Sequence, residues 1–267
     1  MTVAEALNSY NLVARDAFTP KPHFPFATKK GKYSATKLKE ATQSILKDNS
    51  HAGKNTDALY RNSECVKTAV LAVTKDDVSR GPTLFRTYAD DAQYAQTKIW
   101  EVVRATSAAT TFFKPIAVGR DQIVFMDAGF GCNNPCDVLI RECAQALPNQ
   151  EISCIVSIGT GLGRAVGFKG RVSLLKALAK MATESLTVQR RLRDHHANDA
   201  VQQYWRFDED VAISEIRMDD YRQMPRISGF TLNYLNDEKT KSMIEKCADA
   251  IIDARNSRRV VEQPGTS

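Results

Sequence analysis

The sequence predicts an α/β fold in which helices cover a mostly parallel central sheet. Along the 267 residues, apolar segments of strand length alternate with segments of helical periodicity, which is typical of this class. Residues 67–74 and 153–161 are apolar runs, as expected of strands that are buried on both faces. Sites in such sheets form where the strands reach their carboxyl ends.

The chain is expected to open with a helix and then an irregular loop. Residues 2–5, TVAE, have the form of a capping box, and Val3, Leu7 and Tyr10 fall on one face of the helix that follows. Residues 16–33 contain three prolines and therefore predict a loop. The next predicted elements are a helix over 35–48, which Ser34 can cap, and strands over 67–74 and 83–88.

The central part of the chain predicts a strand that ends on an acidic residue. Helical periodicity begins at residue 99, and residues 122–127 form an apolar strand whose last residue is Asp127. Asn134 is a suitable N-cap for the next helix, with Pro135 at its first position. The strand over 153–161 follows that helix.

The C-terminal part predicts a long helical segment, a late strand and a last helix. Residues 172–197 are helical in pattern, with arginines near their end. Core packing with solvated arginines is the favoured interpretation, and an amphipathic helix on an anionic membrane is the alternative. A strand over 204–208 and a helix over 237–254 follow, so we expect one domain over 1–255 and a disordered tail over 256–267.

Composition limits the classes of partner. The net charge of +6 is modest, and no interleaving of aromatic and basic residues suggests a nucleic-acid platform. No run of 18 apolar residues predicts a membrane-spanning helix, and the N-terminus lacks a signal-peptide pattern. Six cysteines in a chain of this length are typical of reduced cytosolic thiols. We therefore expect a cytoplasmic protein that can also contact a membrane surface peripherally.

Neither a metal site nor a nucleotide loop is favoured. Cys132 and Cys136 lack a second pair of ligands at zinc spacing, and His195-His196 lies far away in the sequence. The GTGLG run at 159–163 has neither the dinucleotide fingerprint nor the lysine of a phosphate loop. Glycines that permit a tight strand exit explain it better. No cofactor is expected, and nucleotide binding remains a third alternative for the function.

Asp127 is the leading candidate for a chemical role. A carboxylate at the end of a buried strand is partly desolvated, and Ala128-Gly129 lets the backbone approach closely. Such a group can take a proton from a serine hydroxyl or from water. The alternative is that Asp127 only braces the turn by accepting hydrogen bonds from backbone amides.

Three motifs follow one another in the order and spacing of a known family. They are IWEVVRATSAATTFFKP (99–115), MDAGFGCNNP (126–135) and IVSIGTG (155–161). Together they resemble the patatin-like phospholipase family, and YWRF (204–207) with residues 218–235 is similar to the end of that domain in fungal members. The resemblance covers most of residues 30–235 and implies a three-layer α/β/α fold with a mostly parallel central sheet.

The resemblance also implies an activity on lipid or phospholipid acyl esters. Members of this family are serine lipid acyl hydrolases that use a Ser-Asp dyad and no catalytic histidine. Asp127-Ala128-Gly129 resembles their Asp-Gly-Gly/Ala motif, which makes Asp127 the proton acceptor. Ala128 departs from the middle glycine. If that position requires a positive φ, alanine adds strain of about 1 kcal/mol.

The nucleophile that the family requires is missing from this sequence. The family carries it in a Gly-x-Ser-x-Gly elbow upstream of the matched motifs, and the chain has no such sequence. The opening MTVAEAL resembles the helix after the elbow, so we expect that the N-terminal strands of the domain are missing. Ser107 and Ser157 do not lie on a strand-to-helix elbow, and Cys132 and Cys136 have no histidine nearby to form a thiolate.

Two hypotheses for the function are favoured over nucleotide binding. The first is the larger part of a lipid acyl hydrolase whose serine is encoded upstream, with further domains in a longer native chain. The second is a catalytically inactive relative that acts as a binding or interaction module. In either case we expect the isolated chain to be poorly stable or to find a partner, because missing strands leave apolar surface in water.

Overall fold

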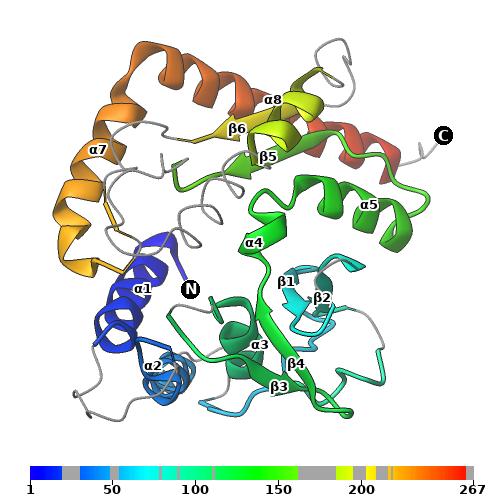
Figure 1. Cartoon of the computed structure of the whole chain (residues 1–267). Helices are drawn as coiled ribbons and strands as arrows, with labels where there is room; N and C mark the ends of the chain where they lie inside the picture. Colours follow the sequence, from blue (N-terminus) through cyan, green and yellow to red (C-terminus); the bar gives the residue numbers. More distant parts are fainter. Residues whose placement is uncertain are drawn as a thin grey trace. The chain divides into compact units, whose positions relative to one another are not determined.

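A computed structural model gives the structure of the protein (Figure 1). It describes residues 1–19, 31–48, 54–77, 80–88, 91–109, 112–161, 185–194, 203–208, 216–217 and 219–262. The chain divides into two compact units, where a single domain was expected. Unit 1 is Met1–Gly131 with Met218–Tyr221, and unit 2 is Cys132–Arg217 with Arg222–Ser267. None of the described helices is both long enough and apolar enough to cross a membrane.

Unit 1 begins with two helices that pack on each other. α1 (Val3–Ala17) starts at the predicted capping box, in which Thr2 Oγ1 accepts from the Glu5 N–H at 3.3 Å and the Glu5 carboxylate accepts from the Thr2 N–H at 2.6 Å. α2 (Ala35–Asp48) lies against α1. A small core of Ala17, Tyr33, Leu38 and Phe113 is buried here.

Asp219 explains why a short C-terminal segment belongs to unit 1. Its carboxylate is buried and accepts a hydrogen bond from the Tyr33 hydroxyl at 2.6 Å. The same oxygen pairs with the Lys32 ammonium at 2.5 Å. These charge-assisted contacts hold the segment against the residues that precede α2.

The sheet of unit 1 is antiparallel. Its strands are β1 (Ala69–Thr74), β2 (Thr83–Arg86), β3 (Ile116–Val118) and β4 (Ile123–Asp127), in the order β2-β1-β4-β3. Each neighbouring pair runs antiparallel, so a mostly parallel central sheet is not confirmed. Short connections such as the one between β3 and β4 can join only antiparallel strands, whereas a parallel pair needs a long crossover.

One helix covers this sheet and completes an apolar core. α3 (Ile99–Thr106) packs on β1, β3 and β4. The rings of Phe85 and Phe125 meet edge to face, with centroids 5.1 Å apart. Both side chains are fully buried, and each contributes roughly 1.5–3 kcal/mol of burial free energy. The core consists of Ala72, Phe85, Val102, Ala105, Val118 and Phe125.

Unit 2 is built around a parallel strand pair. β5 (Cys154–Ile158) and β6 (Gln203–Phe207) run in parallel, with Ser157 opposite Arg206. α8 (Glu238–Glu262) packs against both strands and against α7 (Met224–Asn236). The other elements described are α5 (Cys136–Ala146), helical residues 185–194, and η4 (Tyr221–Gln223) at the boundary of the units.

The burial of β5 differs from the sequence expectation. Ile155 and Ser157 are buried, but Val156 is 41% and Ile158 78% exposed. Successive strand residues point to opposite faces of a sheet, so only one face of this strand lies in the interior of the unit. The prediction that residues 153–161 are buried on both faces was therefore wrong.

Several boundaries also differ. α8 continues to Glu262, so residues 256–262 are helical where a disordered tail was expected. The short strand β3 and the helix α7 were not predicted, and Pro225 is compatible with α7 because it lies in the first turn. The predicted helical residues 172–184 and 195–197 lie outside the described residues, as do residues 20–30 of the predicted loop.

Candidate functional site

Asp127 is the last residue of β4, as the sequence predicts. It lies opposite Ala72 of β1 in the antiparallel ladder. Its backbone N–H donates to the carbonyl of Ala108 at 3.3 Å, which ties the strand end to the segment after α3. Its Oδ1 accepts from the N–H of Gly129 at 2.8 Å, where the short helix α4 (Gly129–Cys132) begins. The turn thus fixes the direction of the carboxylate.

Burial changes the acidity of this carboxyl group. It raises the pKa of Asp127 above its ordinary value, because the ionised form loses hydration. The hydrogen bond from Gly129 favours the ionised form and lowers the pKa, but this effect is the smaller one. A desolvated carboxylate with a raised pKa is a stronger base than one in water.

Small side chains surround the turn that carries Asp127. Ala128 is 4% exposed, and Ala108 is fully buried beside the strand end. Among the described residues other than glycine, only Lys54 and Gln122 have a positive φ. Ala128 therefore adopts an ordinary backbone conformation, and the strain considered for an alanine at this position does not arise.

The carboxylate of Asp127 has one oxygen without a described partner. Gly129 is the only described residue that donates to it, and Oδ2 accepts no hydrogen bond from the described part of the chain. Ser107 lies at the C-cap of α3, and its described contact is a backbone bond to Val103. The structure therefore pairs no described serine with Asp127.

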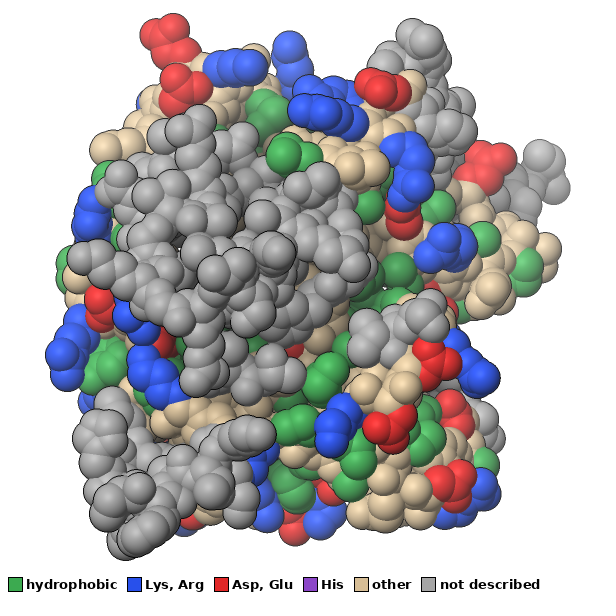
Figure 2. Space-filling view, in the orientation of Figure 1, with side chains coloured by type: hydrophobic (Ala, Val, Ile, Leu, Met, Phe, Trp, Pro, Cys, Tyr) green, Lys and Arg blue, Asp and Glu red, His purple; other side chains and the backbone are tan. Residues whose placement is uncertain are grey.

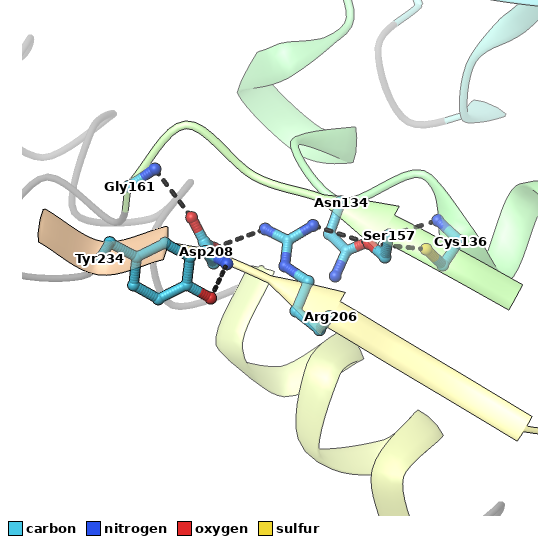
Figure 3. A network of polar contacts seen from close by, with 7 residues as sticks. All are labelled: Asn134, Cys136, Ser157, Gly161, Arg206, Asp208 and Tyr234. Carbon is cyan, nitrogen blue, oxygen red and sulfur yellow. Dashed lines mark hydrogen bonds and ion pairs between the residues drawn. The ribbon is translucent and has the colours of Figure 1, made fainter. Parts of the chain in front are cut away.

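A second polar cluster lies in unit 2 (Figure 3). Arg206 donates through one terminal nitrogen to Ser157 Oγ at 2.7 Å and through the other to Asp208 Oδ2 at 2.6 Å. The side chains of Arg206 and Asp208 are only 7% and 4% exposed. Ser157 Oγ also accepts from the Cys136 thiol at 3.2 Å. Arg206 and Asp208 did not stand out in the sequence, although their spacing of two residues places them on one face of the strand exit.

The contacts of Ser157 and Cys136 in this cluster do not favour either residue as a nucleophile. Ser157 is buried within β5, donor groups surround its oxygen, and no described carboxylate or imidazole contacts it. Cys136 is buried, and its Sγ bonds to that hydroxyl. The N-cap of α5 is Pro135 and not the predicted Asn134, and Asn134 Oδ1 accepts from the Cys136 backbone N–H at 3.3 Å from the position before the cap. Neither Ser157 nor Cys136 is arranged as an activated nucleophile.

The remaining site predictions concern metals and the glycine turn. The described residues contain no group of three or more histidine, cysteine, aspartate and glutamate side chains that could hold a metal ion. His195 and His196 lie outside the described residues. β4, which ends at Asp127, and β5, which precedes the turn at Gly159 to Gly161, belong to different sheets in different units.

The distribution of surface charge adds no further site. On the face shown in Figure 2, the described basic and acidic side chains are interspersed. One ion pair of this kind joins Arg191 of the helical residues 185–194 to Asp137 at the start of α5. Mixed charge of this sort is ordinary for a solvated protein surface.

Comparison with characterised proteins points to one class of enzyme. The chain is 29% identical over 203 residues to calcium-independent phospholipase A2-gamma of Mus musculus and 28% identical over 221 residues to that of Homo sapiens. These alignments cover 68% and 75% of this chain. Phospholipase A I of Arabidopsis thaliana is 32% identical over 114 residues, which is 39% of this chain and 9% of the plant protein. No protein-family model matches the chain.

These relatives confirm the resemblance to patatin-like phospholipases. The likeness to fungal members stays a prediction. The chain spans 25% and 27% of the length of the mouse and human relatives, so most of each relative has no counterpart in these residues.

Proposed function

We propose that residues 1–267 form part of a lipid acyl hydrolase in which Asp127 is the general base for a serine outside these residues. The observation that carries this proposal is the carboxylate itself. It lies at the end of β4, is desolvated, is aligned by the Gly129 N–H at 2.8 Å, and keeps Oδ2 without a described partner. The phospholipase relatives point to phospholipid acyl esters as the substrate class.

The proposed chemistry needs only this carboxylate and a serine hydroxyl. Asp127 takes the hydroxyl proton while the serine oxygen attacks the ester carbonyl carbon. The tetrahedral intermediate collapses to an acyl-serine, and the alcohol of the lipid leaves with the proton from Asp127. Asp127 then takes a proton from water, whose oxygen attacks the acyl-serine. Collapse releases the fatty acid and returns the proton to the serine.

An exposed apolar face on α1 supports a serine that comes from upstream. Val3, Leu7 and Tyr10 share one face of the helix and are 88%, 58% and 60% exposed. By resemblance to the patatin-like phospholipase family, this helix follows the nucleophile elbow. A preceding strand and elbow packed on these side chains would remove them from water, which is favourable by about 25 cal/mol per Å² of apolar area.

The experiment is a fatty-acid release assay on phosphatidylcholine vesicles. The enzyme is the full-length product of the source gene, as wild type and as Asp127→Asn. Removing the general base should lower kcat/KM by roughly 100- to 10,000-fold. Asp121→Asn is the matched control, because Asp121 is an exposed carboxylate of the same unit that pairs with Arg120. It should leave the rate unchanged, and so should chelation of calcium, as the name of the relatives suggests.

Residues 1–267 alone should release no fatty acid in this assay. Full activity of these residues, or an unchanged rate in Asp127→Asn, contradicts the proposal. The second candidate function is a non-catalytic binding or interaction module. A full-length protein that binds the vesicles but releases no fatty acid supports that alternative.

A further inference from the structure

The polar cluster of unit 2 contains an anion that is a side chain of the protein, the carboxylate of Asp208. The carboxylate of Asp208 is 96% buried at the exit of β6 and receives two charge-assisted hydrogen bonds. Arg206 donates to Oδ2 at 2.6 Å, and the backbone N–H of Gly161 donates to Oδ1 at 2.7 Å. Both oxygens are therefore held, one by a cation and one by the turn after β5 (Figure 3).

The glycine turn is shaped around this carboxylate. A Cβ atom at Gly159 would lie 2.3 Å from the Asp208 carboxyl carbon and 2.4 Å from a terminal nitrogen of Arg206. Gly161 adopts a φ of +88°, which a glycine accommodates without strain. The N–H of Gly159 donates to the Phe207 carbonyl at 2.8 Å, so the turn also closes on the end of β6. Any side chain at residue 159 would therefore have to displace the Asp208 carboxylate or the Arg206 guanidinium.

This arrangement lies where α/β proteins usually bind ligands. β5 and β6 are parallel, and the turn and Asp208 both follow their carboxyl ends. Backbone N–H groups in glycine turns together with an arginine are a common way to hold an anion. Here the position that such a ligand would take is filled from within the chain.

We propose that Gly159, Gly161 and Arg206 form a carboxylate cradle that Asp208 occupies as a built-in anion. The occupied cradle fixes the Gly159–Gly161 turn and closes it to phosphate ligands, which excludes nucleotide binding at this turn. Without the Asp208 side chain, the cradle keeps the buried guanidinium of Arg206 and the N–H of Gly161, and it accepts a small free carboxylate. This proposal does not depend on the hydrolase function.

Chemical rescue tests the cradle directly. Asp208→Ala in residues 1–267 should lower the Tm by on the order of 10 °C, because it leaves the buried Arg206 without a carboxylate partner. Sodium formate should restore most of this loss, whereas sodium chloride at the same ionic strength should not. The wild type should respond equally to the two salts. Equal responses of Asp208→Ala to formate and chloride would overturn the proposal, as would an unchanged Tm in that variant.

Tyr234→Phe is the matched control for rescue. The Tyr234 hydroxyl accepts from the backbone N–H of Asp208 at 3.2 Å, so this variant removes a bond from the same segment but leaves the carboxylate in place. Its Tm should fall without any selective response to formate. A selective response here would mean that formate acts elsewhere, which overturns the cradle. If Asp208→Ala does not fold in sodium chloride, the yield of folded protein is compared between sodium formate and sodium chloride. A higher yield in formate then supports the cradle, and equal yields overturn it.

A double-mutant cycle provides the second test. Gly159→Ala should lower the Tm strongly in the wild type, because its methyl group collides with the carboxylate of Asp208. The same change should cost fewer degrees in the Asp208→Ala background, where that carboxylate is absent. Equal losses in the two backgrounds would show that Gly159 and Asp208 are not coupled, which contradicts a cradle built around the carboxylate.

Discussion

The two units of the molecule stabilise their sheets by different means. In unit 1, the sheet packs on α3 through apolar side chains, and the aromatic rings of Phe85 and Phe125 lie in the middle of that core. In unit 2, one face of the parallel pair carries Ser157, Arg206 and Asp208, which are joined by hydrogen bonds of 2.6 to 2.7 Å. The stability of unit 1 depends on the volume of its buried apolar side chains, whereas the stability of unit 2 depends on paired polar groups.

The difference predicts how each unit responds to mutation. An apolar core loses stability roughly in proportion to the volume removed, and it tolerates swaps of similar shape. A buried polar network fails when one partner is removed, because the remaining charge or hydrogen-bonding group stays in the interior without a partner. Substitutions in the two units test this contrast, and the largest expected effect comes first.

Phe125→Ala should have the largest effect. Phe125 is fully buried, and truncation should lower the free energy of unfolding by about 3–5 kcal/mol. Phe125→Leu keeps most of the volume and should lose less than half as much. Denaturant unfolding of residues 1–267 measures both losses. Equal losses for the two variants would mean that volume does not determine the stability of this core.

Arg206→Met should lower the free energy of unfolding by about 3 kcal/mol, because it leaves the Asp208 carboxylate without its cation. The double variant Arg206→Met with Asp208→Leu should lose less than the sum of the two single changes, since no unpaired charge remains. If the loss in the double variant equals the sum of the two single losses, Arg206 and Asp208 are not energetically coupled, and the contrast with unit 1 fails.

Asp127→Asn should stabilise unit 1 at neutral pH. Burial raises the pKa of Asp127 above its unfolded value, so ionisation weakens the fold at a pH above the folded pKa. As the pH falls through the folded pKa, the wild type takes up the proton and this penalty disappears. The variant should therefore have the higher Tm at pH 7, by a margin that shrinks on acidification. A lower Tm for Asp127→Asn at pH 7 would show that the ionised carboxylate stabilises the fold.

Ala128→Gly should have the smallest effect and should be destabilising. Ala128 is buried and has no positive φ, so glycine would only add freedom to the unfolded chain and remove a methyl group from the interior. The expected loss is about 1 kcal/mol in the free energy of unfolding. A gain in stability would mean that this turn strains the alanine.

The sequence predicted local features well. The capping box of α1 and the end of β4 at Asp127 depend on a few neighbouring residues, and both are found. Strand direction depends on pairing between distant residues, and apolar runs do not encode it. The expected parallel sheet is consequently replaced in unit 1 by antiparallel pairs.

The polar cluster of unit 2 could not be predicted from the sequence. Arg206 and Asp208 are far in the sequence from Ser157 and Gly161, and the two groups meet only because β5 pairs with β6. The glycines at 159 and 161 were expected to allow a tight strand exit, and Gly161 does so through its positive φ. Their second role, a close approach to Asp208, follows from the tertiary structure. The role of Asp127 as a base remains a prediction.

The most direct test of the account is the intact mass of the native protein, captured from its source with an antibody to α8 and treated with a fluorophosphonate that labels activated serines. The account predicts a mass above the 29.7 kDa of residues 1–267. It also predicts one adduct, on a serine outside these residues, which disappears in Asp127→Ala. A native mass of 29.7 kDa without an adduct would contradict the account. It would leave a binding or interaction module as the function of the chain.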